Sequence, residues 1–171
     1  MRSYDTFDDL LDYCALSANP VGEMVLSVFG RATPDRIELS DAVCSGLQVT
    51  EHLQDVREDL ARGRVYVPQE DLTRFSCTDA DLLLTPSPER VRTLMAFEVE
   101  RARDLLRRGA PLARRLSARP ALAVAAFCAG GGAALTAIER TGFEVSATPP
   151  KPSLPTLLSA FMQATRSAAV G

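Results

Sequence analysis

The sequence is poor in the residues that build the best-known catalytic and metal centres. It has one histidine, His52, and four cysteines, Cys14, Cys44, Cys77 and Cys128, with no C-x-x-C pair among them. A zinc cluster needs paired ligands at short spacing, and a Ser-His-Asp triad would have to use this one histidine. We therefore expect neither chemistry. We expect the cysteines to be reduced, buried thiols of a cytoplasmic protein rather than a disulfide framework.

An excess of positive charge is also lacking. The 171 residues include 19 Lys and Arg against 22 Asp and Glu, which gives a formal net charge of −3. Such a chain has no overall basic field for nucleic acid, so we do not expect a nucleic-acid partner. A Gly-rich phosphate loop between a strand and a helix is missing as well, because the glycine run at 130–132 lies in an Ala-rich helical stretch.

Long hydrophobic runs are scarce. The N-terminal "MRSYDTFDDLLDYC" is acidic and lacks the apolar centre of a signal peptide. The one uncharged stretch of membrane-spanning length runs from Pro120 to Ile138, but alanine dominates it and three glycines interrupt it. We expect a buried core helix there, because Ala and Gly gain little from lipid. The sequence leaves open whether this cytoplasmic protein contacts a membrane surface as a peripheral protein.

The pattern of apolar residues predicts an all-α fold. At this length, 46% apolar residues suffice for one domain with a core, and the only β-like run is the short "RVYV" before Pro68. Capping residues, prolines and glycines give the helix boundaries. The first expected helix runs from the Thr6/Asp9 cap to Gly30 with a kink at Pro20 and Gly22, and the second from Thr33-Pro34 or Ser40 to Gly63. The third has Ser87 as its cap and Pro88 as its first helical residue, and it runs to Gly109 with a continuation beyond Pro111. The fourth runs from Pro120 to Gly142.

The C-terminal residues differ in composition from the rest. "TPPKPSLP" holds four prolines within seven residues, which predicts an extended linker. "TLLSAFMQATRSAAV" after it has the pattern of a short amphipathic helix. We therefore expect one domain over 1–146 and a tail over 147–171.

A row of polar side chains follows one side of the second expected helix. At 100° per residue, Gln48, Glu51, His52, Asp55 and Asp59 fall within an arc of about 100°. At these spacings the three carboxylates repel one another, each pair by roughly 0.2–0.5 kcal/mol. A bound Mg²⁺ would remove that cost, since it prefers oxygen ligands from one or two carboxylates and from phosphates. The alternative is a solvated acidic edge. An apolar stripe of Val49, Leu53, Val56 and Leu60 lies about a quarter-turn away.

The stretch "LQVTEHLQDVREDLARGRVYVP", residues 47–68, resembles the second aspartate-rich motif of the squalene and phytoene synthase family. That motif reads approximately Q-L-x-N-x-x-(R/Q)-D-x-x-E-D-x-x-x-G-R-x-Y-(L/V/I)-P. Upstream, "YDTFDDLLDYCALSANPVGEMVLSVFG" is similar to the family's Tyr-Cys…Ala-x-x-Val-Gly helix. "ANPVG", "QEDL" and "RRGAPLARRL…AGGGAALTAIERTGFEV" look most like the hopanoid-pathway branch, the C-type squalene synthases.

The resemblance implies the all-α isoprenoid synthase bundle, in which aspartate-held Mg²⁺ binds a prenyl diphosphate. The implied reaction converts presqualene diphosphate to hydroxysqualene or squalene. A phytoene synthase acting on geranylgeranyl diphosphate, and a non-catalytic partner subunit of a full-length synthase, are the alternatives. The resemblance implies Asp55, Asp59 and Glu51 as metal ligands, Gln48, Gln54, Arg64, Val21 and Gly22 as substrate-binding residues, and Tyr13 and Tyr66 as catalytic or packing residues.

Two departures from the family pattern bear on activity. Glu51 stands where the family usually has Asn, which replaces a neutral ligand by a third carboxylate. The family's first aspartate-rich motif has no counterpart, because the early acids, Asp5, Asp8, Asp9 and Asp12, fit helix capping and solvation. We therefore expect an incomplete bundle, the C-terminal portion of a synthase domain, which a homo- or hetero-oligomer would complete.

Overall fold

The computed structural model describes residues 3–146 and 148–169, and the regular elements within them are all helical. In this described part the β-like Arg64–Val67 run forms no strand, only an isolated bridge at Arg64. The prediction of an all-α fold is confirmed.

The first predicted helix is two helices. Thr6 and Asp9 form the expected capping box, and α1 (Phe7–Ser17) is followed by α2 (Asn19–Val28). The predicted kink at Pro20 is wrong in position, because the chain breaks at Ala18. Pro20 then lies in the first turn of α2, where its missing N–H removes no helical hydrogen bond.

The second predicted helix is also divided. It begins at Pro34 rather than Ser40, and α3 (Pro34–Gln54) ends at Asp55, whose backbone angles of −104° and 14° are not helical. The short α4 (Val56–Ala61) follows and leads to Gly63, which has a φ of +72°. The prediction of one continuous helix to Gly63 is therefore wrong at Asp55.

The middle of the chain contains two elements that the sequence pattern did not predict, α5 (Gln69–Arg74) and the 3₁₀ helix η1 (Asp81–Leu83). Helix α6 (Glu89–Gly109) begins one residue later than expected, with Pro88 as its cap. The hydroxyl of Ser87 instead accepts a 3.0 Å hydrogen bond from the Val145 N–H. The expected continuation beyond Pro111 is a 3₁₀ helix, η2 (Ala110–Arg115).

The last two helices lie on one side of the central pair of helices. Helix α7 (Ala118–Arg140) begins two residues before the predicted Pro120 and ends two before Gly142, and α8 (Leu154–Ala169) follows the Pro-rich stretch. Residues 147, 170 and 171 of the predicted tail lie outside the described residues. The division into a domain and a tail stays a prediction.

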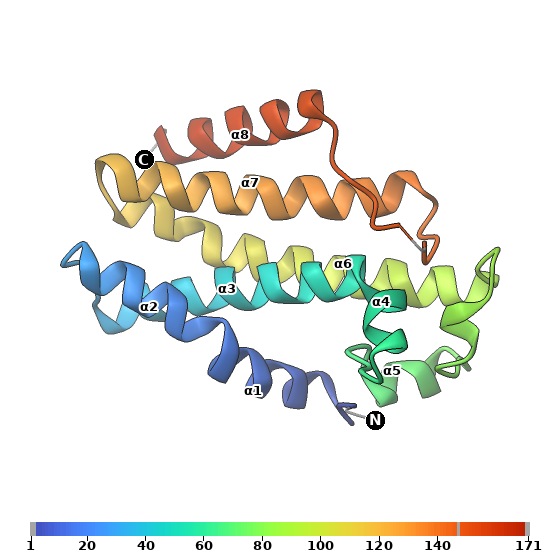
Figure 1. Ribbon diagram of the computed structural model, residues 1–171. Helices are drawn as coiled ribbons and strands as arrows, with labels where there is room; N and C mark the ends of the chain where they lie inside the picture. The colour runs from blue at the N-terminus through green and yellow to red at the C-terminus, as the bar shows by residue number, and fades with distance from the viewer. Residues whose placement is uncertain (1–2, 147, 170–171) are drawn as a thin grey trace.

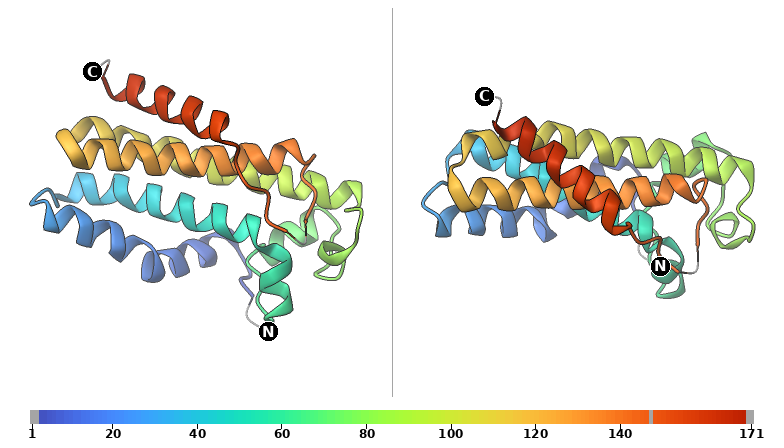
Figure 2. Two further views of the ribbon diagram at one scale, coloured as in Figure 1. Left: turned by 45° about the horizontal axis from the view of Figure 1, so that its top comes forward. Right: turned by 90° about the horizontal axis from the view of Figure 1, so that it is seen from above.

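Helices α3 and α6 run antiparallel through the centre of the molecule (Figure 1). Helix α7 packs on both, α8 covers α7, and α1 and α2 lie on the opposite side of α3 (Figure 2). The apolar stripe of Val49, Leu53, Val56 and Leu60 packs in or against the core, as its spacing predicted. The polar row lies beside this stripe, with Gln48 half-buried and Glu51 exposed.

Helix α7 is long and apolar enough between Arg119 and Arg140 to cross a membrane by length and composition, and 44% of its most apolar window is buried. It packs against α3, α6 and α8. The helix is therefore buried on one side only, since Leu122 and Phe127 are exposed, and contact with a membrane surface stays a prediction.

The cysteines are free thiols in the structure. Cys14 and Cys77 are buried, as expected, whereas Cys44 and Cys128 are only half-buried. The prediction of four buried thiols is thus wrong for two of them. Both border open space, Cys44 in the space beside α2 and Cys128 in the space between α6, α7 and α8.

Candidate functional site

Three carboxylates of the polar row differ in exposure. Asp59 is 8% exposed, Asp55 is half-buried, and Glu51 is exposed. Burial raises the pKa of Asp59, and the charge of Asp55 raises it further against the opposing effect of Arg64. Burial also raises the pKa of Asp55, with a contribution from Glu58. The charge of Asp55 thus makes Asp59 harder to ionise, and a cation beside the two would relieve that cost.

The break at Asp55 determines how these residues are arranged. The Asp59 N–H donates a 2.8 Å hydrogen bond to the Asp55 carbonyl, which keeps helical spacing across the first turn of α4. The Arg64 N–H donates a 2.9 Å bond to the Asp59 carbonyl. Arg64 is thereby fixed beside Asp59 with its side chain exposed.

His52 lies at the centre of this group. Its Nε2 is 3.1 Å from the Gln48 amide nitrogen, and its Nδ1 is 3.7 Å from the Asp59 carboxylate. Its ring stacks on Tyr66, with centroids 3.5 Å apart and planes inclined by 6°. Burial lowers the pKa of His52 to about 4, so the imidazole is neutral at pH 7.

Aromatic rings enclose the same point. Tyr13 and Tyr66 have centroids 5.8 Å apart, and Tyr4 lies 5.5 Å and 5.7 Å from them. Burial raises the pKa of Tyr66 to about 12, with further contributions from a hydrogen bond with Tyr13 and from the charge of Asp59. The two tyrosines predicted from the resemblance are therefore neighbours. Tyr4 and His52 complete the cluster, and the sequence pattern gave neither a role.

Gln54 faces away from this group. Its side-chain amide donates a 2.9 Å hydrogen bond to the Pro150 carbonyl in the Pro-rich stretch. The neighbouring Arg57 donates to the Leu83 carbonyl and the Thr85 hydroxyl. The side chains of Gln54 and Arg57 thus contact the later segments of the chain, whereas Gln48, His52 and Asp59 lie together.

Val21 and Gly22 lie in a different part of the same region, an apolar groove between α2 and α3 on one side and η2 and α7 on the other. Its volume is about 360 Å³, within the range of small-molecule sites. Gly22 permits the approach of α2 to α3, because a Cβ there would lie 2.3 Å from the Ser40 Oγ. The remaining walls are mostly aliphatic or aromatic and include Val25, Phe29, Leu116, Val124 and Phe127.

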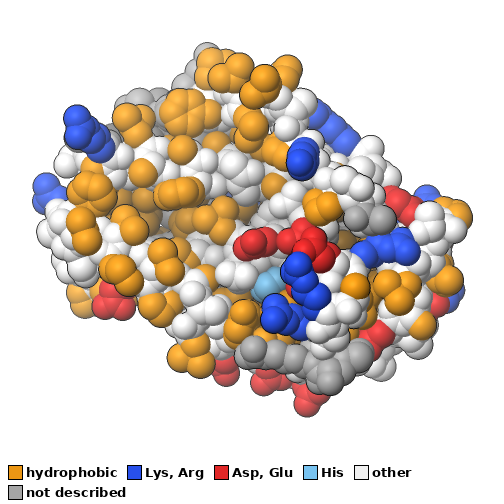
Figure 3. Space-filling model, in the orientation of Figure 1, with side chains coloured by type: hydrophobic (Ala, Val, Ile, Leu, Met, Phe, Trp, Pro, Cys, Tyr) orange, Lys and Arg blue, Asp and Glu red, His pale blue; other side chains and the backbone are white. Residues whose placement is uncertain are grey.

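The groove and the acidic group adjoin each other. Gln48 and Glu51 line one end of the groove, one turn before Asp55. In Figure 3 acidic side chains gather beside the single histidine, with basic side chains next to them and a hollow lined by hydrophobic side chains leading away. An amphipathic ligand with an anionic head and an apolar chain would fit this arrangement, provided that a cation lies between the head and the carboxylates.

The donor set fits a magnesium ion only in part. In the described residues no three His, Cys, Asp or Glu side chains converge closely enough to hold a metal ion alone. Asp55 and Asp59 supply hard oxygen ligands, and Mg²⁺ commonly binds one or two carboxylates together with water and phosphate oxygens. The two aspartates therefore suit an ion shared with a diphosphate, rather than a closed protein site.

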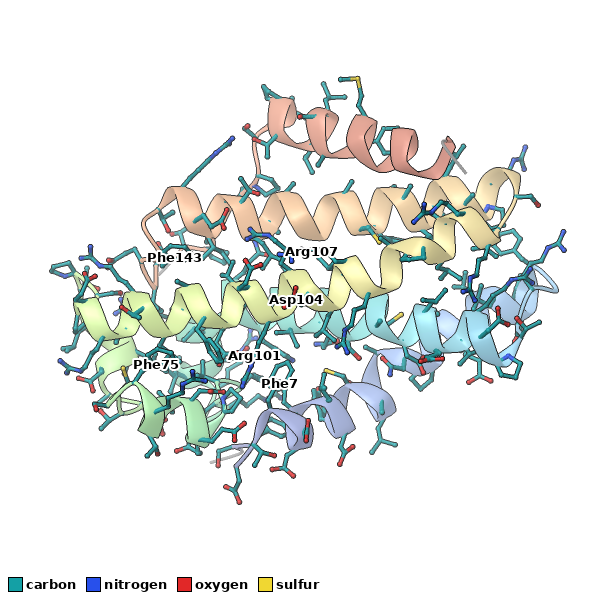
Figure 4. The ribbon with its side chains drawn as sticks, turned by 180° about the vertical axis from the view of Figure 1, so that it is seen from behind. Phe7, Phe75, Arg101, Asp104, Arg107 and Phe143 are labelled. Carbon is teal, nitrogen blue, oxygen red and sulfur yellow. The ribbon has the colours of Figure 1, made fainter. Side chains whose placement is uncertain are left out.

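A second buried charged cluster was not predicted, and one of its members, Glu98, lines the same small cavity as His52 and Asp59. Glu98 and Asp71 are each 1% exposed, and Arg101 donates a hydrogen bond to Asp71. Figure 4 shows Arg101 between α6 and the start of α1, near Phe7. Its guanidinium lies 4.3 Å from the Phe7 ring centroid and 4.4 Å from that of Phe97. In the sequence this cluster is marked only by acidic residues in "QED" and "FEVER". Such acidic residues also fit solvated helix faces.

The family described as squalene/phytoene synthase matches residues 1–157. The chain belongs to this family. Its members are prenyl-transferring enzymes of isoprenoid biosynthesis, which bind prenyl diphosphates and typically depend on divalent metal ions.

Curated relatives carry two different names. A phytoene synthase from Arthrospira platensis is 42% identical over 113 residues, which are 58% of this chain and 37% of the relative. A hydroxysqualene synthase from Rhodopseudomonas palustris is 38% identical over 115 residues, 66% of this chain and 39% of the relative. The chain spans about two-fifths of the length of these relatives.

Solved structures show the same helical fold. The squalene synthase HpnC from Alicyclobacillus acidocaldarius superposes with a TM-score of 0.81 at 43% identity, over 84% of this chain and 55% of that one. A dehydrosqualene synthase in complex with a ligand gives a TM-score of 0.87 at 21% identity, over 100% of this chain and 60% of that one. The prediction of the isoprenoid synthase bundle, present in part, is confirmed.

Proposed function

We propose that the chain forms the diphosphate- and prenyl-binding part of a squalene synthase-type enzyme that converts presqualene diphosphate to hydroxysqualene or squalene. The observation that carries the proposal is the junction of the acidic group with the apolar groove. Gln48 and Glu51 line the end of the groove, and Asp55 and Asp59 follow along the chain with raised pKa values.

The residues have separate tasks in this proposal. Asp55 and Asp59 hold Mg²⁺ together with the diphosphate, and the exposed Glu51 is a third candidate ligand. Bound Mg²⁺ supplies Lewis-acid stabilisation of the charge that develops on the departing diphosphate. The Arg64 guanidinium suits a phosphate oxygen, and its backbone bond to Asp59 keeps it beside the acids.

The groove has the chemistry that a prenyl chain needs. Val21, Val25 and Phe127 supply apolar walls, and Gly22 leaves room for α2 to approach α3. A water-poor environment protects an ionised prenyl group from premature reaction with water. Tyr13 and Tyr66 stay candidates for contact with the reacting part of the substrate, because they border the acidic group from within the core.

Two other functions have specific observations in their favour. The phytoene synthase relative from Arthrospira platensis favours geranylgeranyl diphosphate as the substrate, and the choice between the two depends on chain length. A non-catalytic helical subunit is favoured by the two-carboxylate donor set, which would need ligands from a full-length synthase to complete a metal site.

Product analysis tests the proposal. The purified chain is incubated with Mg²⁺ and either presqualene diphosphate or geranylgeranyl diphosphate, alongside an Asp55→Asn/Asp59→Asn variant. Glu58→Gln is the matched control, because it removes an exposed acid of the same short helix that pairs with Arg62. We expect hydroxysqualene or squalene from the parent and the control, and none from the double variant.

The other outcomes separate the alternatives. Phytoene from geranylgeranyl diphosphate would replace the proposed substrate. No product from either substrate, together with activation when a full-length family member is added, would support the subunit. Equal product from parent and double variant would contradict the role of Asp55 and Asp59.

A further inference from the structure

His52 contacts three parts of the proposed site that come from separate segments of the chain. Gln48 lies on α3, Asp59 on α4, and Tyr66 on the extended segment before α5. The three contacts use different features of the imidazole: Nε2, Nδ1 and the ring face. A purely apolar side chain of this size would reproduce only the last of them.

The hydrogen-bond partners assign the proton on the ring. The amide nitrogen of Gln48 can only donate, so His52 Nε2 must accept. A neutral imidazole that accepts at Nε2 carries its proton on Nδ1, and Nδ1 faces the Asp59 carboxylate at 3.7 Å. The ring therefore accepts a hydrogen bond from Gln48 at Nε2 and turns its Nδ1–H toward the Asp59 carboxylate, which at 3.7 Å lies beyond direct hydrogen-bond distance.

The contacts of His52 matter because they connect residues on the two sides of the break between α3 and α4. Gln48 precedes the break at Asp55, and Asp59 follows it. A continuous helix would fix their relative direction through its backbone, but a break leaves part of that task to side chains. His52 bridges the break with a ring held in place by its stack on Tyr66.

We propose that His52 is a positioning residue. It holds the Asp59 carboxylate and the Gln48 amide in the relative orientation that lets both bind the same metal–diphosphate complex. The inference rests on the function proposed above. It assigns His52 no contact with the substrate and no proton transfer. Its effect is exerted through Asp59 and Gln48.

The composition of the chain provides a local probe. The sequence has no tryptophan and three tyrosines, and all three tyrosines lie in the cluster around His52. Tyrosine fluorescence therefore reports on this region alone. A titration of Mg²⁺ in the presence of inorganic diphosphate, followed by tyrosine fluorescence and by calorimetry, measures binding without any turnover.

Three substitutions separate the contacts of the ring. His52→Phe keeps an aromatic face for Tyr66 and removes both nitrogens. His52→Asn places an amide N–H near the position of Nδ1, and His52→Gln places one near the position of Nε2. Val91→Ala is the stability control, because it removes methyl groups from a fully buried residue of α6 that is not among these contacts.

We expect His52→Phe to weaken metal–diphosphate binding by about 10-fold or more, the size typical when the partner of a metal ligand is lost. His52→Asn should recover most of that loss and His52→Gln should not, since the contact with Asp59 is the decisive one. Val91→Ala should lower the thermal midpoint and leave binding unchanged.

The outcomes distinguish this inference from the proposed function. Equal binding by the parent and His52→Phe would overturn the positioning role and leave the metal site intact. If the three His52 variants and Val91→Ala all bind the metal–diphosphate equally weakly, then His52 acts only as a packing residue. Absence of binding by the parent itself would overturn the metal site, and the role of His52 with it.

Discussion

The Arg101 guanidinium on α6 donates a hydrogen bond to the buried carboxylate of Asp71 on α5 and also lies 3.6 Å from the Glu98 carboxylate. Helix α5 directly follows the segment that carries Arg64 and Tyr66. The ion pair therefore connects that segment to the central α3–α6 pair. One guanidinium faces two buried carboxylates. The second carboxylate must therefore be protonated, or its charge lowers the stability of the folded protein.

Glu98 is the group whose protonation this cluster changes. Burial raises the pKa of Glu98 from 4.5 to about 8, with a further contribution from Asp71 that exceeds the opposing effect of Arg101. Between these two pH values the folded protein holds a proton that the unfolded chain has released. The free energy of unfolding contributed by Glu98 should therefore fall as the pH rises from about 4.5 to about 8.

Glu98→Gln should remove this dependence, because an amide stays neutral throughout. Urea unfolding of the parent and the variant at pH values between 5 and 9 measures the difference in slope. Glu100→Gln, an exposed acid of the same helix paired with Arg103 and Arg107, should keep the slope of the parent. Parallel curves for the parent and Glu98→Gln would show that Glu98 is ionised in the folded protein.

Gly109 permits a close approach between the end of α6 and the first half of α3. A Cβ there would lie 2.7 Å from the Val43 nitrogen and 2.8 Å from the Leu39 carbonyl oxygen, and backbone atoms cannot rotate away. Gly109→Ala should lower the free energy of unfolding by about 1–3 kcal/mol. Thermal or urea unfolding of the purified variant measures this change.

Gly132 on α7 is the matched control, since a Cβ there meets nothing within 4 Å. Gly132→Ala should be neutral or should stabilise the protein by up to ~1 kcal/mol, because alanine favours the helix. An equal loss in both variants would mean that the close contact at Gly109 is not what limits the substitution.

A substitution at Gln54 tests whether its side chain holds the Pro-rich stretch against the helical bundle. Gln54→Ala removes the 2.9 Å hydrogen bond to the Pro150 carbonyl. We expect faster amide hydrogen exchange in the first turn of α8, because the segment before it loses its anchor on α3. Thr50→Ala, which removes a hydroxyl bound within α3, should leave the exchange of α8 unchanged. Unaltered exchange in Gln54→Ala would show that this hydrogen bond does not hold the Pro-rich stretch.

The thiols should react slowly in the folded protein. Burial raises the pKa of Cys14 to about 11 and that of Cys128 to about 11, and it raises those of Cys44 and Cys77 as well. The thiolate is the reactive form, so alkylation by iodoacetamide at pH 8 should be much slower than in the urea-unfolded chain. Mass spectrometry of timed samples would show which cysteines react. Rapid modification of Cys14 under native conditions would contradict its burial.

The sequence by itself determined the helical class, most helix ends and the residues of the acidic row. Local signals suffice for these, because a cap such as Thr6 with Asp9, or a Gly at positive φ such as Gly63, acts within a few residues. The motif over residues 47–68 likewise predicted the family that the comparisons then showed.

Only the tertiary structure decided which members of the row meet. A continuous helix would give Glu51, Asp55 and Asp59 similar surroundings, but the break at Asp55 and the packing of the Arg64–Pro68 segment bury Asp59 and leave Glu51 exposed. The centre of the site, His52 on Tyr66, joins residues that are fourteen positions apart and on different elements. No local pattern encodes such a contact, because it results from the way the segments pack against a common core.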